Sequence, residues 1–87
     1  MTKQEIIQVA NEIKASFNKE VIKDLEFLPL VDRRTLEDTG VGVIFQLSTK
    51  FDYDEATIME WKNKLGADDW FINVKRNQLR LTYYIHF

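Results

Sequence analysis

The chain has no cysteine, one proline, three glycines and a single histidine among its 87 residues. The lack of cysteine excludes disulfides, thiolate nucleophiles and cysteine-ligated zinc, so packing has to supply the stability. No apolar run approaches the roughly 18 residues of a membrane-spanning helix, and the N-terminal segment lacks the apolar core of a signal peptide. These absences lead us to expect a cytoplasmic protein.

Motifs of the common enzyme classes are also missing. The sequence has no G-x-G-x-x-G, G-x-x-x-x-G-K or H-E-x-x-H segment. Asp52, Asp54 and Glu55 resemble the start of a calcium-binding loop, but the glycine and the distal glutamate of such a loop are absent. We therefore expect no catalytic residues, no metal and no cofactor. An enzyme would require His86 to lie in a concave pocket with a carboxylate at hydrogen-bonding distance.

The composition suits one folded domain. Hydrophobic residues make up 45% of the chain and aromatic residues 13%, which excludes a disordered chain. We expect residues 1–87 to form a single domain. The net charge is −2, whereas proteins that bind duplex nucleic acid usually carry a basic excess, because phosphate contacts supply most of their affinity. The charge balance argues against that class.

The N-terminal segment predicts a helix over residues 3–17. Thr2 and Glu5 form the Thr-x-x-Glu pattern in which each side chain satisfies a free backbone donor at a helix start. Apolar residues then recur at spacings of three and four, as on one face of a helix. The same spacing permits the helix to continue through residues 21–25.

A second helix is predicted over about residues 53–65. Asp52 and Glu55 repeat the capping arrangement, and Gly66 can adopt the left-handed conformation that closes many helices. Its apolar face contains Ile58 and Trp61.

Between the two helices the pattern changes to that of strands. Residues 26–31 are apolar, and Pro29 lacks a backbone donor, which favours an edge strand. Residues 32–40 are polar and form either a loop or an extended hairpin arm, with a turn expected at residues 38–40. Residues 41–50 alternate between apolar and polar or small side chains, which indicates another strand.

The C-terminal residues predict a hairpin whose turn is Arg76 and Asn77. In this register every apolar residue on one side faces another apolar residue, and a slip by one position would bury Arg80. The expected apolar pairs are Val74 with Leu79, Ile72 with Leu81 and Trp70 with Tyr83. On the other side Lys75 faces Gln78, Asn73 faces Arg80 and Phe71 faces Thr82.

The element order is thus α-β-β-α-β-β. Helices and strands do not alternate one by one, which disfavours a parallel doubly wound sheet. We expect an α+β two-layer sandwich with a mainly antiparallel four-stranded sheet and both helices on one face.

The outward face of the C-terminal hairpin is the main candidate for function. Aromatic side chains interleaved with basic ones can stack bases and contact phosphates of single-stranded nucleic acid, or can bind a protein. Residues 70–87 contain three basic and no acidic side chains. The alternative is an ordinary solvated face. The candidate residues are Phe71, Asn73, Lys75, Arg76, Arg80, Tyr84 and His86 on the hairpin, with Arg33 and Arg34 in the polar segment.

Strand edges offer a second route to a partner. Both strand 26–31 and the terminal strand are expected to present unpaired backbone groups, to which a protein or a second copy adds a strand. We expect a homodimer through the terminal strand. Arg33 and Arg34 can reach a carboxylate or phosphate.

The functional hypothesis is a small binding protein of the regulatory or inhibitory kind that phages and mobile elements encode. It acts through protein contacts on the outer sheet face or an exposed edge. The alternative hypothesis is single-stranded nucleic-acid binding by the hairpin.

Overall fold

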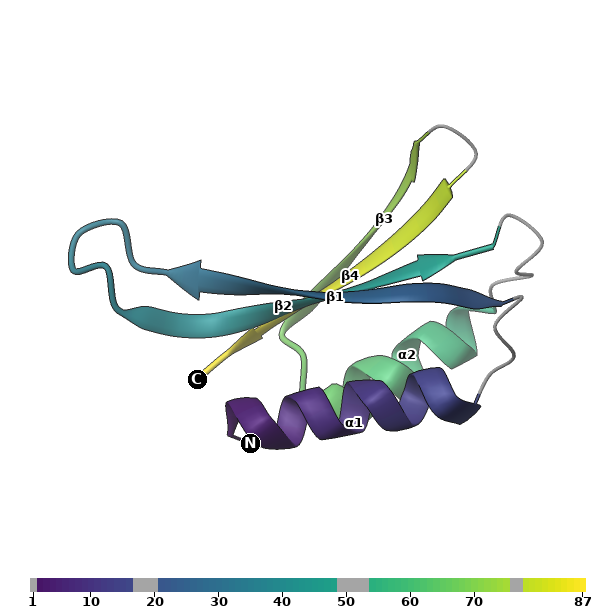
Figure 1. Ribbon diagram of the computed structural model, residues 1–87, viewed down its shortest axis with the longest axis horizontal. Coiled ribbons are helices and arrows are strands. Elements are labelled where there is room, and N and C mark those ends of the chain that lie inside the picture. Colours follow the sequence, from purple (N-terminus) through teal and green to yellow (C-terminus); the bar gives the residue numbers. More distant parts are fainter. Residues whose placement is uncertain (1, 17–20, 49–53, 76–77) are drawn as a thin grey trace.

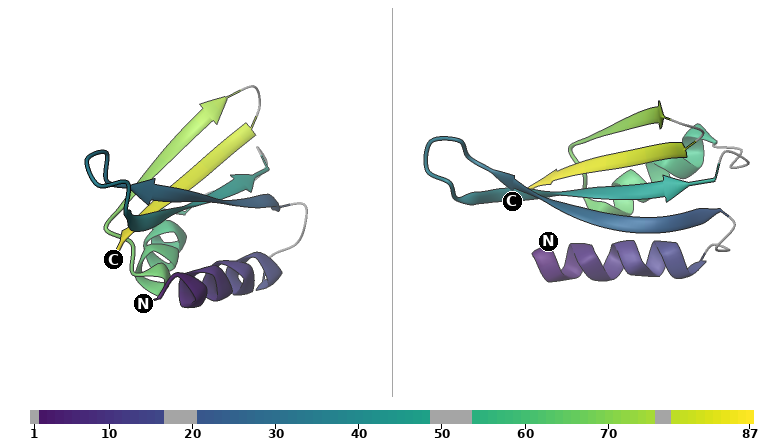
Figure 2. Two further views of the ribbon diagram at one scale, coloured as in Figure 1. Left: turned by 60° about the vertical axis from the view of Figure 1, so that its left-hand side comes forward. Right: turned by 45° about the horizontal axis from the view of Figure 1, so that its top comes forward.

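The computed structural model describes residues 2–16, 21–48, 54–75 and 78–87. The strands form one antiparallel sheet in the order β1-β2-β4-β3, and both helices lie on the same side of it (Figures 1 and 2). The expected α+β two-layer architecture is confirmed. The elements are α1 (Lys3–Ser16), β1 (Ile22–Val31), β2 (Asp38–Leu47), α2 (Glu55–Leu65), β3 (Asp69–Lys75) and β4 (Gln78–His86).

Helix α1 starts at the predicted capping box. The N–H of Glu5 donates to Thr2 Oγ1 at 3.2 Å, and the N–H of Thr2 donates to Glu5 Oε1 at 3.3 Å. The helix ends at Ser16, and Phe17 lies outside the described residues. Its buried residues are all apolar, and because they are spaced by three and four they share the face turned to the sheet: Ile6, Ala10 and Ile13.

Helix α2 begins two residues later than expected. Its N-cap is Asp54, whose Oδ1 accepts the N–H of Ala56 at 2.9 Å. Asp52, the expected cap, lies outside the described residues. Gly66 ends the helix as predicted, with a φ of 65° that favours glycine.

The core lies between the helices and the two central strands. Phe45 of β2 packs against Trp61 of α2 with ring centroids 5.3 Å apart, and Tyr83 of β4 meets Phe45 edge-on at 6.0 Å. The buried Tyr83 hydroxyl donates to the carbonyl of Ile58 at 2.7 Å. Burial raises the Tyr83 pKa well above its usual value. The phenol therefore stays neutral and links β4 to α2.

Strand β1 begins at Ile22, which overturns the alternative that α1 continues through residues 21–25. Ile22 pairs with Leu47 and Leu25 pairs with Phe45. Pairing with β2 packs Ile22 and Leu25 against the hydrophobic core. A longer α1 would have placed the same side chains against that core. The prediction that the Pro29 segment is an edge strand is confirmed.

Residues 32–37 form the tip of a long hairpin that extends past the helices (Figure 1). Asp38 already belongs to β2, so the turn expected at residues 38–40 is wrong. The chain reverses earlier, because Asp32 Oδ1 accepts the N–H of Arg34 at 2.7 Å and Leu36 takes a φ of 59°.

The C-terminal hairpin has the predicted register at every described pair, and its turn, Arg76 and Asn77, lies outside the described residues. Strand β4, however, pairs with both β2 and β3. The expectation that the terminal strand is an edge is therefore wrong, and so is a dimer through it. Val74 faces the helix side yet is 67% exposed, because the twisted hairpin rises away from the helices (Figures 1 and 2).

Two glycines of β2 predict opposite responses to an added methyl group. A Cβ at Gly40 would collide with the carbonyl oxygen of Ile85, whereas a Cβ at Gly42 would meet Leu28 Cβ at an ordinary 3.5 Å. We expect Gly40→Ala to lower the free energy of unfolding by about 1–3 kcal/mol, and Gly42→Ala to change it by less than about 0.5 kcal/mol. Urea unfolding of both variants measures this. Equal destabilisation would contradict the close approach of β2 and β4 at Gly40.

Candidate binding face of the sheet

The side of the sheet turned away from both helices, which we call the outer face, follows from strand alternation. In β2, Val43 and Phe45 are fully buried toward the helices, so Gly42 and Ile44 point to the outer face. The strand register then sets rows of outer-face residues across the sheet. Three of them are Leu28–Gly42–Tyr84–Asp69, Glu26–Ile44–Thr82–Phe71 and Asp24–Gln46–Arg80–Asn73.

A hollow of about 280 Å³ lies on the outer face. All four strands line it, through Leu28, Ile44, Phe71, Asn73, Arg80, Thr82 and Tyr84. Leu28 is 50% exposed and Phe71 is 55% exposed. Gly42 has no side chain to stand between Leu28 and Tyr84 in its row. The hollow is thus an open concavity flanked by partly exposed apolar groups.

Charges on the outer face are paired rather than uniformly basic. Arg80 Nη2 lies 3.4 Å from Glu26 Oε2, and Gln46 Nε2 donates to Glu26 Oε1 at 3.1 Å. Arg80 Nε is buried without a hydrogen-bond partner among the described residues. Asp69 adds a second acidic position in the Leu28 row. The basic character expected from the hairpin alone is therefore offset by acids that the other strands contribute.

Four of the predicted site residues come together at the hollow: Phe71, Asn73, Arg80 and Tyr84. Arg33 and Arg34 lie apart from them, exposed at the tip of the β1–β2 hairpin. For Lys75 only the backbone position at the end of β3 is described, and Arg76 lies outside the described residues.

His86, at the end of β4, pairs with a carboxylate and does not line the hollow. Its Nδ1 lies 2.8 Å from Asp68 Oδ2, and its backbone N–H donates to the same oxygen at 2.9 Å. These hydrogen bonds lower the pKa of Asp68. Both side chains are more than half exposed. The pair connects the end of β4 to the segment before β3.

Sequence reasoning missed the part of the hollow that the first hairpin supplies. Leu28, Gly42 and Ile44 reach the outer face because β1 and β2 pair with Leu28 opposite Gly42. The alternation of side chains from Val41 onward predicts which β2 residues point to the outer face. Leu28 can be placed on that face only when the register between β1 and β2 is known.

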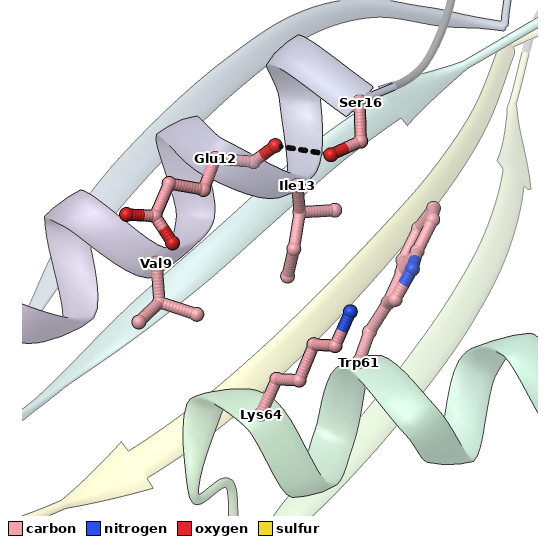
Figure 3. A pocket seen from close by; sticks show the side chains of 6 residues that line it. All are labelled: Val9, Glu12, Ile13, Ser16, Trp61 and Lys64. Atoms are coloured by element: carbon pink, nitrogen blue, oxygen red, sulfur yellow. Dashed lines mark hydrogen bonds between the residues drawn. The ribbon is translucent and has the colours of Figure 1, made fainter.

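A second concavity, of about 360 Å³, lies between α1 and α2 (Figure 3). Its polar groups are already engaged, since Lys64 Nζ lies 3.1 Å from Glu60 Oε1 and the Ser16 hydroxyl donates to the Glu12 carbonyl at 2.8 Å. Gln8 Nε2 donates to the Glu12 carboxylate at 3.3 Å, and the rest of the lining is Val9, Ile13 and Trp61. The groove lies along the boundary between the two helices.

Within the described ranges, no cluster of three or more His, Asp or Glu side chains is placed to hold a metal ion. None of the helices in those ranges combines the length and hydropathy needed to cross a membrane. No family model, curated protein or solved structure matches the chain. Any function has to be argued from the geometry of the outer face.

The Asp68–His86 pair predicts a dependence of stability on pH. The Asp68 pKa is below its usual 3.8 in the folded protein, so its contribution is complete above that value and disappears as the pH falls through the lower folded pKa. Asp68→Asn should unfold at a lower urea concentration than the wild type at neutral pH, and the difference should vanish in strong acid.

Asp38→Asn is the control, because Asp38 is an exposed acid at the start of β2 and its replacement should leave the unfolding midpoint unchanged. Equal unfolding midpoints of Asp68→Asn and wild type at neutral pH would show that the pair contributes nothing to stability.

Proposed function

We propose that the protein is a non-enzymatic binding module whose outer face docks a protein partner. The observation that carries this proposal is the hollow on the uncovered side of the sheet, with Leu28 and Phe71 each about half exposed beside it. Large apolar side chains around an open concavity are how protein interfaces seat an anchoring residue. Such a protein acts by occupying its partner, which fits a regulatory or inhibitory role.

The geometry supports a partner of a particular chemistry. The proposed partner places an apolar side chain over Gly42, between Leu28 and Tyr84. A lysine or arginine next to it on the partner would meet Asp69, the acidic residue in the same row. The expected partner is therefore a protein segment that presents an apolar anchor beside a basic residue.

A protein partner is favoured over single-stranded nucleic acid by the charges. Phe71 and Tyr84 offer aromatic rings, but Arg80 is held by Glu26, and Asp69 lies in the Tyr84 row. Phosphates need uncompensated cations along their path. We expect no binding of a mixed-sequence single-stranded oligonucleotide at about 50 mM salt, where electrostatic affinity is enhanced.

A displayed library of random peptides tests the proposal even though the natural partner is unidentified. Peptides selected on the wild-type protein should share an aromatic or aliphatic residue next to a lysine or arginine. They should bind Gly42→Val at least about tenfold more weakly, equivalent to about 1.4 kcal/mol, because the added side chain would stand between Leu28 and Tyr84, where the proposed anchor lies.

Leu36→Ser is the control, since Leu36 is 77% exposed at the distant hairpin tip and its replacement should leave peptide affinity unchanged. Circular dichroism and urea unfolding establish that Gly42→Val is folded. Peptides that bind Gly42→Val as tightly as wild type would overturn the proposal. Oligonucleotide binding that Arg80→Ala abolishes would support nucleic-acid recognition instead.

A further inference from the structure

The two edge strands of the sheet differ in how well they are protected from pairing with another strand. Strand β1 contains Pro29 and two register irregularities, both of which disfavour the addition of a strand. Strand β3 has neither proline nor glycine, and its pairing with β4 is regular from Asp69 to Lys75. The open edge of β3 is thus available for further pairing.

The hydrogen-bonding pattern identifies which β3 groups face the open edge. The N–H of Phe87 donates to the Thr39 carbonyl, and the N–H of Asp68 donates to the Tyr84 carbonyl. Odd-numbered residues of β4 therefore bond toward β2 and even-numbered ones toward β3, since backbone groups alternate in direction along an antiparallel strand.

The β3 residues that pair with the even-numbered residues of β4 are the odd-numbered ones, as Phe71 does with Thr82. The backbone groups of Trp70, Ile72 and Val74 consequently point to the open edge. Consistent with this direction, the Trp70 N–H donates to Asp69 Oδ1 at 2.8 Å rather than to β4. An incoming strand would find acceptors at Trp70, Ile72 and Val74 and donors at Ile72 and Val74, and pairing at Trp70 would exchange its N–H bond to Asp69 for one to the incoming strand.

We propose that β3 pairs antiparallel with β3 of a second copy of this chain, about a twofold axis at Ile72. The sequence Asp-Trp-Phe-Ile-Asn-Val-Lys is its own complement in that arrangement. Ile72 meets Ile72 of the second copy, Trp70 meets Val74, Phe71 meets Asn73, and Asp69 meets Lys75. Each apolar position on the helix side thus faces another apolar position, and the acidic end faces the basic end.

The arrangement accounts for an exposed side chain that the single chain leaves uncovered. Val74 is 67% exposed on the helix side, and Trp70 of the second copy would lie directly against it. The two sheets join edge to edge into one of eight strands. Phe71 and Asn73 of the hollow's lining, together with Asp69, also border this contact, so the dimer is tested below by readouts that need no docked peptide: the scattering mass and disulfide cross-linking. A foreign strand would have to reproduce the same pattern of charges and apolar groups, which a second copy already has.

Light scattering coupled to size exclusion gives the first test. We expect a mass twice the chain's 10.3 kDa, and a monomer at high micromolar concentration would overturn the proposal. The absence of cysteine permits a direct test of the contact. Ile72→Cys should form an intermolecular disulfide on mild oxidation, because opposed residues in such a pair lie about 5.5 Å apart between Cα atoms.

Val74→Cys is the matched control on the same side of β3. Its two copies would lie about 13 Å apart along the strands, too far for a disulfide, although Val74 is the more exposed position. Equal cross-linking of Val74→Cys and Ile72→Cys would show random collision and would overturn the proposed register.

A charge exchange tests the same register without altering an apolar residue. Asp69→Lys alone and Lys75→Asp alone should each shift the scattering mass to that of a monomer, because like charges then oppose each other. The double variant should restore the dimer. A dimer that persists in both single variants, or fails to return in the double variant, would contradict the pairing of Asp69 with Lys75.

Discussion

The structure depends on the alternation of side chains in β2, the central strand between β1 and β4. Val43 and Phe45 are fully buried under the helices, and Gly42 and Ile44 point the other way. Because β2 pairs on both sides, its orientation fixes which residues of the neighbouring strands reach the core and which reach the outer face. A slip by one residue would exchange the two sets and expose the core to water.

Local signals in the sequence predicted much of the fold. The capping box of Thr2, the glycine that ends α2 and the register of the C-terminal hairpin depend on residues close together in the chain, and each was predictable. The start of β1 was not, because Ile22 and Leu25 have a spacing that suits a helix stripe as well as a strand. The position of β4 inside the sheet depends on pairing with β2, and the pattern within one hairpin does not contain that information.

The candidate site likewise combines residues that were predictable from local sequence with residues that depend on strand pairing. Phe71, Arg80 and Tyr84 were predictable as neighbours because one hairpin presents them. Leu28 comes from a strand that pairs with β2 rather than with the C-terminal hairpin. Glu26 comes from that same strand and pairs with Arg80. The hairpin alone therefore suggested a more basic surface than the assembled sheet has, and this difference disfavours the nucleic-acid alternative.

One side of the sheet packs against the helices and forms the core, whereas the other side carries the outer hollow. Adjacent residues of β4 test this division most directly, since Leu81 is fully buried and Thr82 lines the outer hollow. Urea unfolding should show Leu81→Ala to be less stable by about 2–5 kcal/mol, and Thr82→Ala by no more than about 1 kcal/mol. Comparable losses at the two positions would contradict the division of the sheet into a core side and an uncovered outer side.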